Sequence, residues 1–266
     1  MTKPSEIKPL GDYDKYIHAM IVADAGFGKT VFGGTSEKAL FLTTDPEGTI
    51  SAKMFGSTAE EWRIESWTEH NKAFAYLRDG GIKELGLNWV IVDNISEAQN
   101  LALFETMALA RARNKNLDEF VPSQQDYQRS QNMMKVMVKK FHDLPVNILW
   151  TSWQAIQEDR DGEIFYAPAI HGQQGSLAQT IAGYMNIVGY GEVVEDGVRR
   201  VWFSHAEAFR GKDRFNVLGD FRDRLTVPKM QSLVEGALRK ANTSSTTNNT
   251  IKKAPAARVG VKPRRK

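Results

Sequence analysis

The chain has 266 residues, of which 41% are hydrophobic and 25% are charged, and these fractions are typical of a globular protein. It contains no cysteine, which excludes a disulfide framework and a thiolate metal site. No apolar run approaches the roughly 20 residues that a membrane-spanning helix needs, and no signal-peptide core follows the first residues. We therefore expect a soluble, cytoplasmic protein with one large α/β domain and no membrane partner.

The net charge of +3 is spread unevenly along the chain. Residues 242–266 hold seven Lys or Arg and no acidic residue, among many Thr, Asn, Ala and Pro. Such a composition buries too little apolar surface to fold. We predict a flexible leader at 1–15, one domain at 16–240 and a disordered basic tail at 241–266. The tail is either a polycation with salt-sensitive affinity for phosphate backbones or a solubilising end.

The first predicted element is a buried strand at 16–23, which the segment Ala-Asp-Ala-Gly-Phe-Gly-Lys-Thr at 23–30 follows directly. This segment has the pattern of a P-loop, in which main-chain N–H groups of a Gly-rich turn and of the next helix point at phosphates. One position departs from the motif, because Ala23 stands where the first glycine belongs. An alanine serves there if its backbone angles stay ordinary.

The P-loop pattern assigns a role to each of its residues. Gly26 and Gly28 allow the main chain to approach phosphates closely. Lys29 would contact the β- and γ-phosphates of ATP, and the Thr30 hydroxyl would ligate Mg²⁺. The predicted nucleotide-binding residues are Asp24, Ala25, Gly26, Phe27, Gly28, Lys29, Thr30 and Val31. The alternative is a surface Gly-Lys-Thr turn, which the strand before the motif disfavours.

A second strand is predicted at 39–43, and the turn at 44–48 ends it with a Pro and a Gly. Hydrolysis needs a carboxylate that orients the attacking water, and Asp45 and Glu47 are the candidates for this role. Turn chemistry alone also explains both residues, because Asp-Pro-Glu-Gly is a favourable turn sequence.

Residues 63–67 are predicted to form a third strand and residues 70–85 a helix that two glycines interrupt. The next strand, at 88–93, is continuously apolar, as central parallel strands are, and a carboxylate closes it. This is the Walker-B pattern, in which Asp93 would hold Mg²⁺, often through water. An aspartate in this place can also cap a turn, but the P-loop strand needs such a partner beside it.

Two helices follow, at 95–112 and at 123–142, the second with Ser123 as its N-cap. A buried strand is then predicted at 146–151. Gln154, just past its end, is either a sensor of the γ-phosphate or a solvent-facing loop residue.

Residues 155–177 are predicted to form a long polar loop, and loops of that length in compact domains are functional or mobile. Strands at 186–190 and 198–203 then flank an Asp-Gly pair, which is a hairpin signal. The alternation of strands and helices before this hairpin predicts an α/β fold with a mostly parallel sheet, flanked by helices and ending antiparallel.

The order of these parts resembles the RecA-like phage ATPases, minimal recombinases that assist single-strand annealing. The shared parts are the P-loop, the acid after the next strand, the Walker-B strand, the Gln-bearing strand end before a long loop, and Lys212-Asp213-Arg214. They span about residues 16–220. The resemblance implies a RecA-like P-loop core and a Mg²⁺-dependent ATPase that single-stranded DNA stimulates. It also implies a homo-oligomer, located in the host cytoplasm if the protein is phage-encoded.

The resemblance further implies roles for individual residues. Asp45 matches the water-activating glutamate of RecA, with one methylene fewer, and Glu47 would compensate. Lys212 and Arg214 match two cations that reach the ATP of the neighbouring subunit, although a solvated basic edge also explains them. Fixed cations there stabilise the negative charge of phosphoryl transfer. The predicted catalytic residues are Lys29, Asp45, Glu47, Gln154, Lys212 and Arg214.

Two segments match the DNA-binding loops of RecA, the first at 111–121 and the second at 157–177. Aromatic side chains there would stack on bases, and basic side chains would follow phosphates. The predicted DNA-binding residues are Arg111, Arg113, Lys115, Arg160, Phe165, Tyr166, His171 and Gln173. The expected partners are single-stranded DNA, further copies of the chain and, through the tail, DNA or a single-strand-binding protein.

The sequence thus predicts a protein that binds and hydrolyses ATP, binds single-stranded DNA and assists phage DNA recombination or annealing. Three other functions stay open. A small-molecule kinase would need an Arg-rich lid and an acceptor-binding acid, and neither is evident. A packaging motor or helicase loader would share the Walker motifs and the basic tail. A nucleotide-controlled interaction protein with little turnover would fit Ala23 and the short Asp45.

Overall fold

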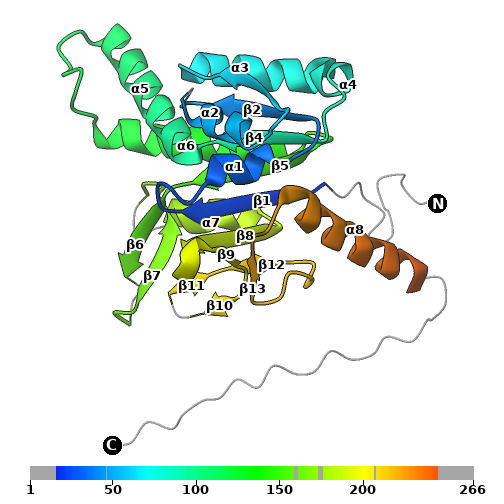
Figure 1. The fold of residues 1–266 in the computed structure, drawn as a ribbon. Coiled ribbons are helices and arrows are strands. Elements are labelled where there is room, and N and C mark those ends of the chain that lie inside the picture. Colours follow the sequence, from blue (N-terminus) through cyan, green and yellow to red (C-terminus); the bar gives the residue numbers. More distant parts are fainter. Residues whose placement is uncertain (1–15, 46, 159–160, 173–175, 207, 245–266) are drawn as a thin grey trace, which may run out of the picture.

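A nine-stranded sheet forms the centre of the computed structural model, which describes residues 16–45, 47–158, 161–172, 176–206 and 208–244 (Figure 1). The strand order is β13-β9-β8-β1-β5-β4-β2-β3, and β12 pairs with β8 beside this path. The strands are β1 (His18–Ala23), β2 (Ala39–Thr43), β3 (Glu60–Arg63), β4 (Trp89–Asp93), β5 (Asn147–Ser152), β8 (Ile187–Val193), β9 (Arg199–Trp202), β12 (Lys212–Asp213) and β13 (Phe221–Asp223).

All neighbours from β3 through to β8 pair in parallel. The pairs β8–β9, β9–β13 and β8–β12 are antiparallel. The predicted fold class, a mostly parallel α/β sheet with an antiparallel end, is therefore confirmed. Because parallel strands end at one edge, the residues that follow β1, β2, β4 and β5 meet at the carboxyl edge of the sheet.

Helices cover both faces of the sheet (Figure 1). They are α1 (Lys29–Gly34), α2 (Gly48–Met54), α3 (Trp67–Tyr76), η1 (Leu77–Gly81), α4 (Ile82–Glu84), α5 (Ile95–Arg113), α6 (Gln124–His142), α7 (Ser176–Tyr184), the short η3 (Glu195–Gly197) and α8 (Val227–Ser244). Two small hairpins complete the fold, one of β6 (Gln154–Glu158) with β7 (Ile164–Pro168), the other of β10 (His205–Ala206) with β11 (Phe209–Arg210). In the part of the chain described here, no helix is long and apolar enough to cross a membrane.

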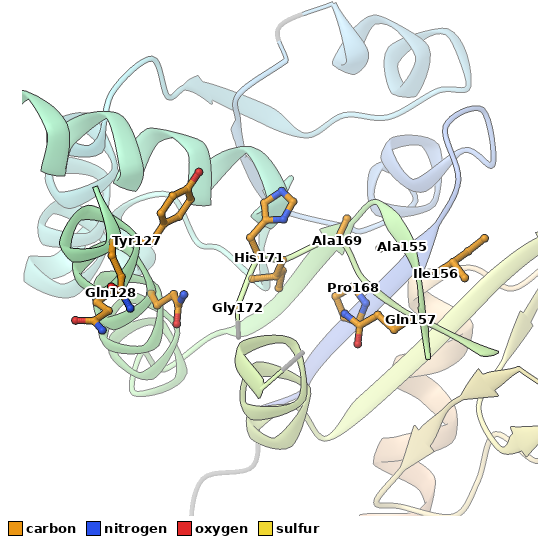
Figure 2. Close-up of a pocket in the computed structure, with 12 residues that line it drawn as sticks. Tyr127, Gln128, Ala155, Ile156, Gln157, Pro168, Ala169, His171 and Gly172 are labelled. Carbon is orange, nitrogen blue, oxygen red and sulfur yellow. The ribbon is translucent and has the colours of Figure 1, made fainter. Parts of the chain in front are cut away.

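Helix α6 begins as its sequence predicts. The Ser123 hydroxyl accepts a hydrogen bond from the main-chain N–H of Asp126, and the Asp126 carboxylate accepts one from the main-chain N–H of Ser123. This reciprocal capping satisfies N–H groups that a helix start otherwise leaves unpaired. Tyr127, one turn further on, is 41% exposed and lines a pocket between α6 and the β6–β7 hairpin (Figure 2).

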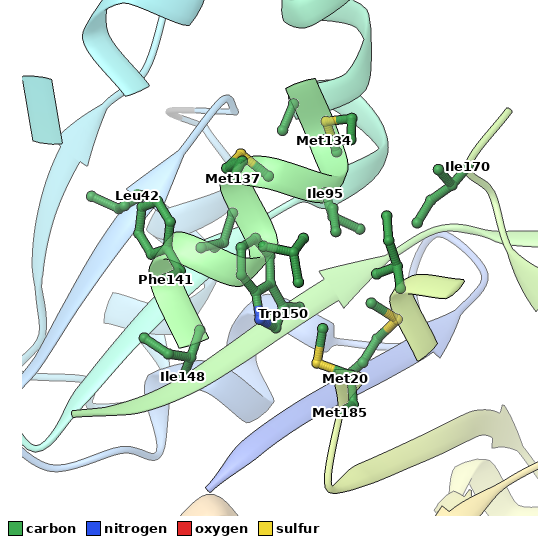
Figure 3. Close-up of a cluster of buried hydrophobic side chains, with 14 of the residues drawn as sticks. Met20, Leu42, Ile95, Met134, Met137, Phe141, Ile148, Trp150, Ile170 and Met185 are labelled. Carbon is green, nitrogen blue, oxygen red and sulfur yellow. The ribbon is translucent and has the colours of Figure 1, made fainter. Parts of the chain in front are cut away.

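Two apolar clusters hold the helices to the sheet. Side chains alternate along β1, so that Met20 and Val22 enter one cluster with α3, α5, α6 and α7, and Ala19 and Ile21 enter the other with α1 and α8. In the first cluster, the Trp150 ring of β5 packs edge-on against Phe141 of α6, at 5.7 Å between ring centres (Figure 3). Burial on both faces explains why the central strands are continuously apolar.

Two predictions of local structure were wrong. The expected loop at 155–177 contains the β6–β7 hairpin and the start of α7, because side chains of β7 are buried despite its polar surroundings. The third strand is Glu60–Arg63 rather than 63–67. It is an edge strand without the apolar pattern of a central one, and Ser66 already caps α3 by accepting a hydrogen bond from the main-chain N–H of Glu69.

The predicted domain boundaries stay predictions. Helix α8 continues to Ser244, past the predicted domain end at 240. The predicted leader at 1–15 and the rest of the predicted tail lie outside the described residues.

Buried histidines predict a loss of stability in acid. Burial lowers the pKa of His18 to about 3, with a further contribution from His142, which stacks on it at 3.7 Å between ring centres, and burial lowers the pKa of His70 to about 4. The unfolded chain takes up these protons near the ordinary value of 6.5, so the free energy of unfolding falls as the pH drops below that value. The slope is about 1.4 kcal/mol per pH unit for each histidine.

Urea unfolding at about pH 7 and about pH 5 measures this loss, which we expect to reach several kcal/mol. A His18→Met variant should lose markedly less stability between the two pH values than the natural chain. Equal losses would show that His18 is not responsible.

Candidate nucleotide-binding site

The loop at 24–28 joins β1 to α1 at the carboxyl edge of the sheet. Gly26 and Gly28 have φ values of 82° and 95°, in the left-handed region that favours glycine. Ala23 is the last residue of β1 and pairs in strand geometry with Gly191 of β8. The alanine at the first motif position therefore has ordinary backbone angles, so no glycine is required there.

The Lys29 side chain lies across this loop. Its ammonium group donates hydrogen bonds to the main-chain oxygens of Ala23 and Asp24, at 2.8 and 2.9 Å. Burial lowers the pKa of Lys29, and the nearby charges of Asp93 and Asp24 oppose this shift. A cation thus lies against the glycine-rich turn, and a lysine together with the main-chain N–H groups of such a turn binds phosphates.

Thr30 and Asp93 meet at the same edge. The Thr30 hydroxyl donates to Asp93 Oδ2 at 2.7 Å, and the Thr151 hydroxyl at the end of β5 donates to Asp93 Oδ1 at 2.5 Å. Oxygen ligands of this kind suit Mg²⁺. Among the described residues no group of three or more His, Asp or Glu side chains could hold a metal alone. The donor set fits a Mg²⁺ ion that takes its other ligands from a nucleotide and water.

Comparison with protein families finds an AAA domain that matches residues 15–215. The chain belongs to this AAA-domain family. The match begins just before β1 and includes the P-loop, Asp93 and Lys212. The family is one of P-loop nucleoside triphosphatases, so the chain is a nucleotide-binding protein of that kind, and such domains typically use ATP with Mg²⁺. No curated protein matches the sequence.

Asp45 stabilises the turn that follows β2. Asp45 Oδ1 accepts hydrogen bonds from the main-chain N–H groups of Glu47 and Gly48, each at 3.1 Å, and both acidic side chains are exposed. The main-chain N–H of Thr44 binds the Asp93 carbonyl, which places this turn beside the Walker-B strand. The structure therefore brings Asp45 to the correct edge, where its carboxylate is engaged in turn chemistry.

Gln154, which the sequence left as either a γ-phosphate sensor or a loop residue, lies close to the P-loop. It begins β6 and lines a pocket of about 490 Å³ together with Asp24, Gly26, Phe27 and Tyr166. Its Oε1 atom is buried and has no hydrogen-bond partner among the described residues. An amide in this position is suited to a polar ligand held by the loop.

Lys212 and Arg214 lie at the other edge of the sheet. Lys212 faces Val188 near the start of β8, and its ammonium group donates to the main-chain oxygens of Ala182 and Gly183 at the end of α7. Arg214 also donates to the Gly183 oxygen, at 3.0 Å. Cations at the end of a helix stabilise its unpaired carbonyls. Within one subunit neither residue reaches the P-loop.

The predicted DNA-binding residues of the first segment lie at the end of α5 and just after it. Arg113 and Lys115 are exposed, and Arg111 forms an ion pair with Glu119. Of these three residues, Arg113 and Lys115 form no ion pair with a carboxylate of the described chain.

The second predicted DNA segment requires a correction. Phe165 is only 8% exposed, with the Arg210 guanidinium 5.1 Å from its ring centre, so this ring presents no face to a base. Tyr166 is half-buried and packs on Phe209 at 5.3 Å between ring centres, so its predicted stacking on a base stays a prediction. His171 lines the pocket in Figure 2. Arg160 and Gln173 lie outside the described residues.

Two residues of the site were missed by the sequence predictions. Thr151 ends a predicted strand, and pairing that strand beside the Walker-B strand would have placed its hydroxyl next to Asp93. Arg199 of β9 donates its Nε–H to the Phe27 carbonyl at 2.5 Å. No local pattern marks Arg199, because the contact joins residues 172 positions apart.

Proposed function

We propose that this AAA domain binds and hydrolyses ATP with Mg²⁺ and uses that cycle to control single-stranded DNA in phage recombination or annealing. The observation that carries the ATPase part is the meeting of Lys29, Thr30 and Asp93 around one glycine-rich turn. Thr30 and Asp93 would hold a Mg²⁺ ion, which would neutralise the charge that develops during phosphoryl transfer.

The side chains of the site have distinct tasks in this proposal. Lys29 exchanges its two main-chain oxygens for the β- and γ-phosphates. Thr30 and Asp93, whose side chains already meet, would hold the Mg²⁺ ion through their oxygens. The Thr151 hydroxyl continues to hold Oδ1 of Asp93, which keeps the carboxylate oriented while Oδ2 acts.

The pocket in Figure 2 supports the proposed binding of single-stranded DNA. It has a volume of about 630 Å³ and lies between α6 and the β6–β7 hairpin. Figure 1 shows this hairpin and the turn between α5 and α6 on the same side of the molecule. The pocket side chains that can hydrogen-bond or stack with bases are Gln124, Tyr127, Gln128, Gln131, Gln157 and His171. Amides and an exposed phenol ring are groups that bind unpaired bases.

A homo-oligomer is part of the proposal. The P-loop and the pair Lys212 and Arg214 lie at opposite edges of one sheet. A head-to-tail neighbour would bring this pair to the ATP of the next subunit, where cations stabilise the transition state.

The experiment that tests the proposal compares ATP hydrolysis with and without single-stranded DNA. We expect DNA to raise the rate, and Tyr127→Ala to weaken DNA binding about tenfold through the loss of one stacked ring. Tyr127→Phe should keep the affinity because it keeps the ring. Phe55→Ala removes an exposed aromatic side chain just after α2 and serves as the matched control. A hydrolysis rate indifferent to DNA would contradict the recombination role.

A second candidate function is a nucleotide-controlled interaction protein with little turnover. The engagement of Asp45 in its own turn favours it, because water activation needs a free carboxylate. Phosphate release distinguishes the two functions. Tight binding of ATP without release, in the presence of DNA, would support this second candidate.

A further inference from the structure

The β8–β9 hairpin holds the P-loop from outside at two points. Arg199 donates its Nε–H to the Phe27 carbonyl at 2.5 Å. The Phe27 ring lies against Gly191 of β8, where an added Cβ would come within 2.5 Å of the ring. The main chain and the side chain of Phe27 are thus both in contact with the hairpin.

The contact with Arg199 determines where the next N–H group points. The Phe27–Gly28 peptide bond is trans, so its C=O and N–H point in opposite directions. With the carbonyl turned toward Arg199, the N–H of Gly28 points away from the hairpin. In a P-loop the main-chain N–H groups of this turn are the ones that point at phosphates.

The loop itself does not fix this orientation. Glycines lie on both sides of Phe27, and glycine adopts positive and negative φ almost equally well. Rotation of the peptide would turn a carbonyl oxygen toward the phosphates and an N–H group away from them. A hydrogen bond from a charged donor is stronger than one from a neutral donor, and it favours one orientation of the peptide.

The charge of Arg199 is available for this task. Within the described part of the chain, no carboxylate forms an ion pair with its guanidinium. The next residue, Arg200, behaves differently. Its guanidinium binds the Asp223 carboxylate at 2.7 Å and lies over the Phe221 ring at 3.9 Å. Two adjacent arginines of β9 thus have separate partners, and only Arg199 contacts the loop.

We infer that Arg199 is a positioning residue of the nucleotide site, which holds the Phe27–Gly28 peptide with its N–H toward the phosphates. The inference rests on the proposed binding of ATP at the P-loop. Arg199 couples the nucleotide to the β8–β9 hairpin, because ATP and the hairpin stabilise the same orientation of the Phe27–Gly28 peptide. By reciprocity, bound nucleotide should also stabilise the hairpin.

Calorimetric titration with Mg²⁺ and ATP tests this role. Arg199→Met, which keeps an unbranched apolar stem and loses both donor and charge, should weaken ATP affinity about tenfold or more. Arg199→Lys keeps a charged donor and should restore most of the affinity. Arg200→Met is the matched control on the same strand and should bind ATP as the natural chain does.

Hydrogen exchange of main-chain N–H groups distinguishes a positioning role of Arg199 from a general loss of packing. Without nucleotide, main-chain N–H groups at 24–31 should exchange faster in Arg199→Met than in the natural chain, at an unchanged melting temperature. Addition of ATP should slow exchange at 187–203 in the natural chain and less so in the variant. If Arg199→Met melts early, Arg199→Gln, which keeps a neutral donor, replaces it in both measurements.

Natural affinity in a folded Arg199→Met variant would overturn the inference and leave the proposed function intact. An Arg199→Lys variant as weak as Arg199→Met would also overturn it, because shape rather than the charged donor would then matter. If the natural chain binds no ATP in the presence of Mg²⁺, the proposed function itself fails.

Discussion

Lys29→Ala will lose ATP hydrolysis, with the rate falling roughly a thousandfold, because no other cation among the described residues takes the place of Lys29 against the turn to meet the transferring phosphoryl group. The partial burial of Lys29 strengthens this expectation, since a charge acts more strongly on a neighbour where water is scarce. Phosphate release at saturating ATP and Mg²⁺ measures the effect.

The matched control is Lys53→Ala, which removes an exposed lysine from α2 and should leave the rate unchanged. A comparison of melting temperatures separates lost catalysis from lost folding, because the Lys29 ammonium also bonds two main-chain oxygens of the loop. Substantial hydrolysis by a folded Lys29→Ala variant would show that the reaction takes place elsewhere.

Asp93→Asn will reduce hydrolysis by roughly a hundredfold or more, while nucleotide binding without metal persists. The variant removes the carboxylate charge that faces Thr30 and replaces one oxygen ligand with an amide group. Thr151→Val should act more mildly, because Asp93 keeps its charge and loses only the hydroxyl that orients it. We expect it to raise the Mg²⁺ requirement about tenfold.

Titration of the hydrolysis rate with Mg²⁺ distinguishes these two variants. Thr106→Val, which removes a buried hydroxyl from α5, is the control for a lost buried threonine. If the Mg²⁺ requirement of Thr151→Val equalled that of the control, the proposed orientation of Asp93 by Thr151 would be wrong.

The sequence predicted the central sheet and the centre of the site because both depend on short segments. The P-loop is contiguous with β1 and α1, and Asp93 ends a strand that is apolar enough to be recognised as central. Parallel pairing then brings these segments to one edge. The local sequence pattern of these segments therefore agrees with the fold that they form, as is usual in natural proteins.

The errors concern contacts between distant parts of the chain. Phe165 was predicted to be a loop residue whose ring stacks on bases, but β7 packs beside β11, and the main-chain N–H of Tyr166 binds the Ala208 oxygen. The contact of Arg199 with the P-loop depends on the pairing of β8 with β1. Neither contact leaves a periodic pattern, because each depends on the arrangement of the whole sheet.

The placement of the P-loop at one end of β8 and of Lys212 at the other gives the subunit a polarity. In a linear array, the Lys212 side of each subunit would contact the P-loop side of the next, so the array would be directional. One terminal copy would keep an uncovered P-loop, and the other would keep an uncovered Lys212 and Arg214. The terminal copy with the uncovered P-loop would lack the Lys212 and Arg214 of a neighbour, which stabilise the transition state of hydrolysis in the other copies. Turnover per subunit would therefore rise with the length of the array, and closure into a ring would remove the deficit.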